Sequence, residues 1–247
     1  MIAKEELNIL WSLEQTAEKY ADRVAVSDVD QELTWKELVK NAQVIGAELS
    51  EKVQPGNPVP VLLEKSTETL AVMLGIVYAG CFYVPVNPMN PAERLRKIME
   101  KLEPEVIISD EKGKEQLAAV GNGLENKVMG PEALTTATGT ELSEEQYSRL
   151  EQIQGQWKET DVLYGIFTSG STGTPKAIVV SHGAASRFIR HFTEIFEITS
   201  ADVIGNQAPF DFDVSVKDIY SSIMTGAQLV LIPKEYFSTP PRLLDYL

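Results

Sequence analysis

Cysteine and histidine are almost absent from this sequence, and their scarcity excludes several classes of protein. Cys81 is the one cysteine among 247 residues, so neither an intramolecular disulfide framework nor a cysteine-based zinc cage can form. The two histidines, His182 and His191, leave little material for a histidine-rich metal site. A chain of this length can bury a core large enough to fold without disulfides or metals. We therefore assign no metal ligands and interpret all three residues as structural or solvent-facing.

Positive charge is also scarce. The 22 Lys and Arg residues face 36 Asp and Glu residues, which gives a net charge of −14 at pH 7. Such a charge opposes the phosphates of nucleic acids and of anionic membranes, so neither is expected as a partner, although a local cationic site is compatible with it. Residues 1–15 lack the positively charged start and the apolar core of an export signal, so we expect a cytoplasmic protein.

One stretch without charge, residues 69–92, is long enough to resemble a membrane span. Its flanking residues favour a different interpretation. Ser66 and Thr67 are typical helix-capping residues, the helix is expected to end at Ala79, and Gly80 suits the left-handed position after a helix. The stretch therefore predicts a buried helix followed by a buried strand at residues 81–86.

Helix and strand signals alternate along most of the chain. Hydrophobic residues make up 43% and charged residues 23%, which is typical of a globular protein. The expected strands are residues 59–63, 81–86, 106–108, 162–167, 177–180, 203–206 and 228–232. The expected helices begin near residues 34, 66, 91, 181, 215 and 239. Apolar strands between amphipathic helices predict an α/β fold with layered, mostly parallel sheets covered by helices on both faces.

Residues 111–160 interrupt this pattern, because they are polar and punctuated by glycine and threonine. We expect short irregular elements here, with an edge strand near Val128 and a helix that begins at the capping box of Ser143 and Gln146. The last expected helix opens at residues 239–241, and the sequence stops inside it, so we expect the chain to be truncated.

The segment richest in chemistry contains only hydroxyl residues, glycine, proline and lysine, and lies between two apolar strands. It consists of Thr168, Ser169, Gly170, Ser171, Thr172, Gly173, Thr174, Pro175 and Lys176. Its glycines allow backbone N–H groups to turn inward around an anion, the hydroxyls can donate to phosphate oxygens, and the lysine adds a mobile positive charge. It is not a Walker A loop, because proline stands where that motif has glycine. Composition alone would also fit a flexible linker, but a linker is not needed between adjacent buried strands.

Residues 163–177 (LYGIFTSGSTGTPKA) resemble the phosphate-loop signature of the adenylate-forming superfamily, which includes acyl-CoA synthetases, luciferases and nonribosomal peptide synthetase adenylation domains. Residues 33–38, 79–86 and 212–215 resemble the first, second and fourth core motifs of that family, in the same order. One departure is Ala177, which stands where the family usually has glycine. The resemblance implies that residues 1–247 form the N-terminal part of the large domain of such an enzyme.

Residues 206–220 (NQAPFDFDVSVKDIY) are most similar to the amino-acid-activating branch, and closest to D-alanine–carrier protein ligases. The resemblance assigns Phe212 and Asp213 to the substrate pocket, where Asp213 would bind the substrate ammonium. The physical reason is that a buried charge without its partner costs about 3–5 kcal/mol. A simpler interpretation of Asp213 is the N-cap of the following helix.

Lys217 has two interpretations that the sequence leaves open. Four residues after Asp213, it suits an ion pair along one helix face, worth about 0.3–0.5 kcal/mol. By its position in the family motif it lines the side-chain pocket, where D-alanine ligases carry an apolar residue. In that place a lysine would suit a substrate with a second carboxylate, such as glutamate or aspartate.

The resemblance implies attack of an amino-acid carboxylate on the α-phosphorus of ATP, followed by transfer of the acyl group to the phosphopantetheine thiol of a carrier protein. Thr168 to Lys176 would hold the β- and γ-phosphates, with Mg²⁺ sharing the charge. The later family motifs, including the catalytic lysine, would lie beyond Leu247, so we expect the chain alone not to turn over. The alternatives are an acyl- or aryl-CoA ligase fragment and a non-catalytic nucleotide-binding relative.

Overall fold

The computed structural model describes residue 3 and residues 5–135, 141–168 and 175–246. The strands are β1 (Val24–Ser27), β2 (Glu32–Thr34), β3 (Pro58–Leu62), β4 (Phe82–Pro85), β5 (Ile107–Ser109), β6 (Val128–Met129), β7 (Val162–Thr168), β8 (Lys176–Ser181), β9 (Val203–Asn206) and β10 (Gln228–Leu231). The α-helices are α1 (Ile9–Tyr20), α2 (Trp35–Ser50), α3 (Thr67–Tyr78), α4 (Ala92–Leu102), α5 (Glu111–Val120), α6 (Pro131–Thr135), α7 (Glu144–Gly155), α8 (His182–Ile195), α9 (Val214–Thr225) and α10 (Pro240–Tyr246). Short 3-10 helices are η1 (Glu5–Leu7), η2 (Leu124–Lys127) and η3 (Lys234–Ser238).

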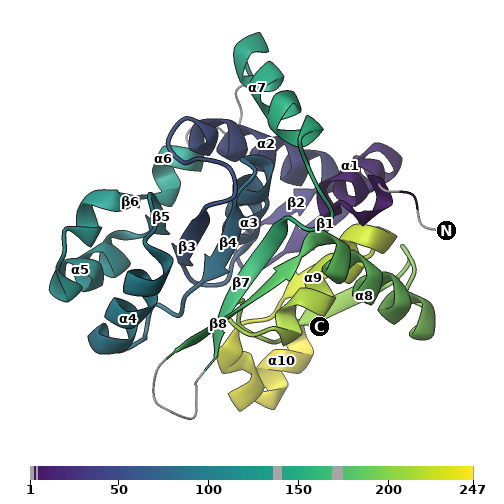
Figure 1. Cartoon of the computed structure of the whole chain (residues 1–247). Coiled ribbons are helices and arrows are strands. Elements are labelled where there is room, and N and C mark those ends of the chain that lie inside the picture. The colour runs from purple at the N-terminus through teal and green to yellow at the C-terminus, as the bar shows by residue number, and fades with distance from the viewer. Residues whose placement is uncertain (1–2, 4, 136–140, 169–174, 247) are drawn as a thin grey trace.

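The strands form two sheets (Figure 1). One sheet has four strands in the order β2-β1-β10-β9, and the other has six in the order β6-β5-β3-β4-β7-β8. Neighbouring strands are parallel except for the pairs β1–β2 and β7–β8, which are antiparallel. The predicted α/β architecture with mostly parallel sheets is therefore confirmed.

Along each strand of the six-stranded sheet, the side chains of successive residues point to opposite faces, as the pleat of a strand requires. Val61 and Ile108 belong to a large core cluster with α1, α2, α3 and α9, whereas their neighbours Leu62 and Ile107 pack with α4 and α5. The large cluster also contains Val26 and residues of β10, so it joins the two sheets into one core. Helices thus cover both faces of the central strands β3, β4 and β5.

The terminal signals of two helices act as the sequence predicts. Thr34 and Glu37 form both hydrogen bonds of a capping box at the start of α2. Gly80 follows α3 with φ of +75°, the left-handed conformation in which glycine lacks the Cβ strain of other residues. Helix α3 is buried on all sides, and no helix in the described part of the chain is long and apolar enough to cross a membrane.

The prediction of short irregular elements at residues 111–160 was wrong in part. Residues 111–120 form the regular helix α5, whose first turn is capped by the Asp110 carboxylate, which accepts a hydrogen bond from the Gly113 N–H at 2.8 Å. The expected edge strand near Val128 and the helix capped by Ser143 are both present. The expectation of helices on both faces does not extend to β8, whose residues 176–179 are exposed.

Candidate functional site

The hairpin of β7 and β8 presents the ends of the predicted phosphate loop. β7 is buried through Ile166 because its apolar residues enter the core, and it becomes exposed at its last residue, Thr168. Thr168 pairs with Lys176, the first residue of β8, so the two exposed residues lie opposite each other across the antiparallel ladder. Ser169, Gly170, Ser171, Thr172 and Gly173 lie outside the described residues. Among the residues that are described, Lys176 makes no ion pair, so its ammonium is available to an anion.

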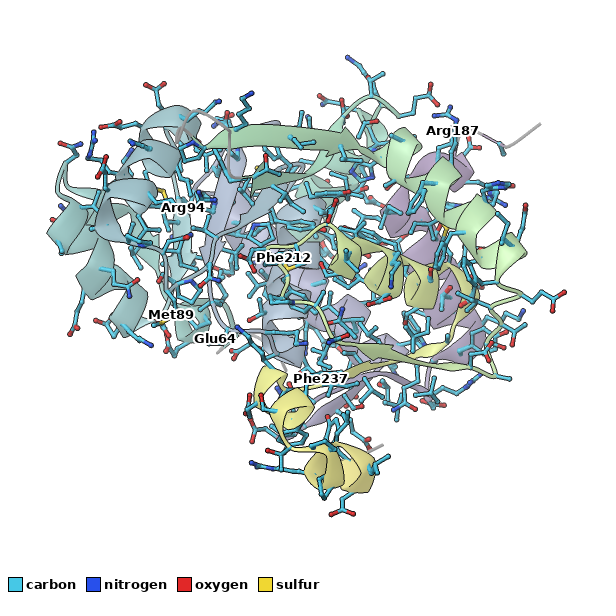
Figure 2. All side chains as sticks on the ribbon, turned by 90° about the horizontal axis from the view of Figure 1, so that it is seen from below. Glu64, Met89, Arg94, Arg187, Phe212 and Phe237 are labelled. Carbon is cyan, nitrogen blue, oxygen red and sulfur yellow. The ribbon has the colours of Figure 1, made fainter. Side chains whose placement is uncertain are left out.

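The second half of the candidate site is the start of α9. Asp213 occupies the N-cap position, but its backbone is helical and its side chain accepts no capping hydrogen bond. The Ser215 hydroxyl instead donates to the Phe212 carbonyl oxygen at 2.7 Å. The interpretation of Asp213 as a helix cap is therefore wrong, and the exposed carboxylate remains open to a ligand. Phe212, next to it, is 55% exposed and lies between α9 and the part of the molecule that carries Arg94 and Met89 (Figure 2).

A cluster of three tyrosines brings the two halves together. The rings of Tyr83 in β4 and Tyr164 in β7 stack with centroids 5.9 Å apart, and the hydroxyl oxygens of Tyr83 and Tyr220 in α9 lie 2.6 Å apart. Burial and the charge of nearby Asp213 raise the pKa of Tyr164 to about 12. The carboxylate that begins α9 thus lies close to the strand that leads into the phosphate loop.

Lys217 does not form the helical ion pair with Asp213 that the spacing allows. Its Nζ lies 2.5 Å from Asp218 Oδ1, while Asp218 Oδ2 accepts a hydrogen bond from Asn206 Nδ2 at 3.1 Å. Asp218 is buried and the Lys217 side chain is 35% exposed. Lys217 is therefore paired with Asp218 and does not neutralise the Asp213 carboxylate.

Sequence interpretation missed Lys65, which lies between β3 and α3. Its Nζ donates to the carbonyl oxygens of Asn206 at 3.0 Å, Gln207 at 3.2 Å and Ile232 at 2.9 Å. Burial lowers the pKa of Lys65 to about 8, and the charges of Asp218 and Glu235 oppose that shift. The available signal was a lone cation between a buried strand and a capped helix, but the sequence does not show which carbonyls it meets.

A cavity of about 520 Å³ lies beside Lys65, where strands of the two sheets end. Its lining includes Asn87, Phe210, Asp211 and Lys234. Burial raises the pKa of Asp211, although the Asn87 side chain and the charges of Arg94 and Lys234 counteract the shift. The segment that ends at Asp213 therefore forms one wall of this cavity.

His182 and Cys81 are structural, as the sequence suggested. His182 is buried, its Nδ1 accepts the Ile9 N–H at 3.4 Å, and Trp157 packs against its ring edge-on. Burial lowers the pKa of His182 to about 4, so it is neutral near pH 7. Cys81 is buried, and burial raises its thiol pKa to about 12, which keeps it protonated and unreactive.

The described residues suit the phosphates of ATP better than they suit a directly bound Mg²⁺. No group of three or more His, Cys, Asp and Glu side chains in the described part of the chain is placed to hold a metal. Mg²⁺ commonly keeps several waters and binds through phosphates and one or two carboxylates, so these residues suit a metal delivered with the nucleotide rather than a protein cage. Thr168 and Lys176 suit the phosphates, since they offer a hydroxyl and an ammonium at neighbouring strand ends.

These features define an α/β protein whose exposed hydroxyl and ammonium groups at one hairpin suit phosphates, and comparison with known families identifies it further. The chain belongs to the AMP-binding enzyme family, whose model matches residues 13–247. This match confirms the resemblance to adenylate-forming enzymes predicted from the sequence.

Similar curated proteins are large peptide synthetases. The chain is 30% identical over 223 residues to tyrocidine synthase 1 of Brevibacillus parabrevis, covering 90% of the chain and 20% of that protein. It is 29% identical over 232 residues to gramicidin S synthase 2 of Brevibacillus brevis, covering 93% of the chain and 5% of that protein. The chain therefore spans only a small part of these relatives.

Solved structures share the fold. VinN in complex with 3-methylaspartate matches with a TM-score of 0.79 at 23% identity, covering 95% of this chain and 64% of VinN. The AMPPNP-bound form of a variant of the nonribosomal peptide synthetase FmoA3 matches with a TM-score of 0.76 at 26% identity, covering 92% of this chain and 23% of FmoA3.

Proposed function

We propose that residues 1–247 are the N-terminal part of an adenylation domain, and that the complete protein activates an amino acid with ATP as an aminoacyl adenylate. The observation that carries this proposal is the open Asp213 carboxylate beside β7, the strand that leads into the hydroxyl- and glycine-rich loop. Asp213 would bind the substrate ammonium, and Phe212 would pack beside it. Thr168, Lys176 and the intervening loop residues would bind the β- and γ-phosphates.

In this reaction the amino-acid carboxylate attacks the α-phosphorus and pyrophosphate leaves. The chain's own residues contribute position and charge: Asp213 fixes the amine end, and Lys176 stabilises charge on the departing phosphates. Mg²⁺ bound with ATP would share the phosphate charge. The AMPPNP-bound FmoA3 relative supports ATP as the co-substrate. We further propose a carrier-protein phosphopantetheine thiol as the acceptor and the cytoplasm as the location, in keeping with the peptide synthetases that the chain resembles.

We propose that the substrate is a dicarboxylic amino acid, with Lys217 facing its second carboxylate. The Lys217 side chain is 35% exposed, and its ammonium has three protons, of which the contact with Asp218 uses one, so further donors remain for an anionic group. The related fold of VinN has been solved with L-aspartate and with 3-methylaspartate, which supports this class of substrate.

The test is amino-acid-dependent ATP–pyrophosphate exchange, measured with the complete gene product on amino acids and simple carboxylic acids. Asp213→Asn should reduce kcat/KM for the amino acid by about a hundredfold or more, because an amine without its carboxylate loses about 3–5 kcal/mol. Lys217→Met should shift preference from aspartate or glutamate toward uncharged amino acids. Exchange with fatty or aryl acids, unaffected by Asp213→Asn, would favour an acyl- or aryl-CoA ligase instead. Unchanged preference in Lys217→Met would reject Lys217 as the residue that faces the substrate side chain, and a wild type that does not prefer aspartate or glutamate would reject the dicarboxylic substrate.

A further inference from the structure

We infer that Lys65 is a positioning residue of the half of the site that contains Asp213. It holds the segment from residue 207 to Asp213 at a fixed place relative to the hairpin of β7 and β8, which presents the predicted phosphate loop. This inference rests on the proposed function for its kinetic consequence, but its structural part stands alone. The two half-sites belong to different sheets, since the hairpin extends the six-stranded sheet and the Asp213 segment follows β9 of the four-stranded sheet. A side chain that connects the two sheets at this point therefore sets the distance between the two half-sites.

The hydrogen bonds of Lys65 make that connection. Lys65 follows β3, a central strand of the six-stranded sheet. Its acceptors belong to the other sheet, since Asn206 is the last residue of β9, and Gln207 and Ile232 are the residues that follow β9 and β10. Two of the acceptors, the carbonyls of Asn206 and Gln207, open the segment that runs to Asp213. The third, the carbonyl of Ile232, fixes the end of the neighbouring strand. Figure 2 labels Glu64 and Phe212, the chain neighbours of Lys65 and Asp213, and shows both toward the middle of the view.

The chemistry of an ammonium group suits this role. It carries three protons, and the three carbonyl oxygens at 2.9–3.2 Å match them one for one. The planar fork of an arginine could not converge on three separate carbonyls in the same way. Because Lys65 is half-buried, water competes only in part for these hydrogen bonds.

Lys65 is itself held in place from the following residues. Ser66 caps α3 by accepting the Thr69 N–H at 3.1 Å, and the Thr67 N–H donates to the Asp28 carboxylate at 2.8 Å. Asp28 in turn follows β1 of the four-stranded sheet. These hydrogen bonds fix the backbone next to Lys65. A residue can position other groups only if its own backbone is held in this way.

The Asp213 segment depends on this anchor more than the hairpin does. Among described residues, Asp213 has no side-chain hydrogen bond of its own, so its position follows from the backbone before it and from α9 after it. Tyr220 anchors α9 to β4, and Lys65 anchors the start of the segment. The hairpin is held by an antiparallel ladder between residues 162–168 and residues 176–181, and the hydrogen bonds that Lys65 donates go to the other sheet.

The structural test is hydrogen–deuterium exchange on the chain, comparing wild type with Lys65→Met, Lys65→Gln and the control Lys234→Met. Lys234 lines the same cavity and is exposed, but makes no hydrogen bond to these carbonyls. In Lys65→Met, amides of residues 207–213 should exchange roughly tenfold faster, while peptides from β7 and β8 stay unchanged. Lys65→Gln, which keeps a donor, provides a milder variant if the methionine variant folds poorly. Equal acceleration in both regions, or none in either, would overturn the inference.

The kinetic test uses ATP–pyrophosphate exchange by the complete gene product. Lys65→Met should raise the KM for the amino acid roughly tenfold or more while the KM for ATP stays within about twofold, since only the amine-binding half is displaced. A purely structural role would predict lower thermal stability with both KM values unchanged, and that result would refute the positioning role. Absence of amino-acid-dependent ATP–pyrophosphate exchange in wild type would instead refute the proposed function. Hydrogen–deuterium exchange of residues 207–213 would still decide whether Lys65 holds the segment.

Discussion

At the scale of single residues, the link between Tyr83 and Tyr220 shows how a buried polar pair places a functional element. Both side chains are nearly inaccessible to solvent, so each hydroxyl depends on the other for its hydrogen bond. Burial raises the pKa of both phenols, which keeps them neutral and able to share one proton donor and one acceptor. The pair therefore fixes α9, and with it Asp213, against β4.

Replacing one member of the pair should cost more stability than the loss of a single hydrogen bond. Tyr220→Phe leaves the Tyr83 hydroxyl buried without its partner, and urea unfolding should show a loss of about 1–3 kcal/mol. The double variant Tyr83→Phe/Tyr220→Phe should cost less than the sum of the single changes, since no orphaned hydroxyl remains. Tyr147→Phe, at a residue that is 53% exposed, is the control and should change stability by less than about 0.5 kcal/mol. Additive single changes would contradict a coupled pair.

The residues proposed to carry the chemistry could be chosen from the sequence, but the residues that arrange them could not. Asp213 and Lys176 were recognisable because they stand in a motif of contiguous residues. Lys65 and its carbonyl partners are separated by more than 140 residues of chain, and Tyr83 and Tyr220 by 137. Such contacts depend on how the two sheets pack, which no local pattern encodes. Local spacing also suggested an ion pair between Lys217 and Asp213, whereas in the folded chain Lys217 pairs with Asp218.

At the scale of the element, the end of α3 shows why one glycine is required. Gly80 has a positive φ, and a Cβ placed there would lie 2.7 Å from Ile153 Cγ2 and 3.1 Å from Pro55 Cβ. Both the backbone conformation and the close approach of α7 therefore exclude a larger side chain. This one position joins the buried helix to β4, the strand that carries Tyr83.

Gly80→Ala should destabilise the chain through both effects. We expect thermal or urea unfolding to show a loss of roughly 1–3 kcal/mol, from the left-handed backbone and the overlap with α7. Gly155→Ala is the matched control, because a Cβ there meets nothing within 4 Å and the residue ends a regular helix. That variant should be neutral or more stable by up to about 1 kcal/mol. Equal losses in both variants would show that neither feature of Gly80 matters.

Helix and strand positions were largely predictable where an apolar run lies between clear boundary residues, as in α3, β4 and β7. The exception at α5 has a physical cause. Gly113 lowers the helix propensity of that segment, and only Leu117 gives it a strong apolar anchor. A Cβ at position 113 would collide with Ser109 Oγ, so the close packing of α5 against β5 requires glycine there. The same glycine weakens the helix signal in the sequence. The exposure of β8 could not be predicted, because its apolar residues resemble those of a covered strand.

At the scale of the whole molecule, the buried neutral His182 makes stability depend on pH. In the folded chain its pKa is about 4, whereas the unfolded value is 6.5. Between these two values the unfolded chain binds more protons than the folded chain, so the free energy of unfolding falls as pH falls from 6.5 to 4. Well above pH 6.5 His182 is neutral in both states and contributes no slope.

We expect His182 to account for about 3 kcal/mol of lost stability between pH 6.5 and pH 4. His182→Asn retains an oxygen that can accept the Ile9 N–H but cannot titrate in this range. Urea unfolding of wild type and variant at several pH values should therefore give curves that converge on acidification. Parallel curves would show that His182 has the same pKa in the folded and unfolded chain, contrary to the effect of its burial.

The open side of β8 has a consequence for handling the isolated chain. Among the described strands, β8 pairs with β7 alone, and its residues Ile178 and Val179 are 52% and 55% exposed. A row of unsatisfied backbone groups flanked by apolar side chains can pair with the same row of another copy. The oligomeric mass measured by light scattering should consequently rise with protein concentration, and a charged residue in place of Val179 should slow that self-association.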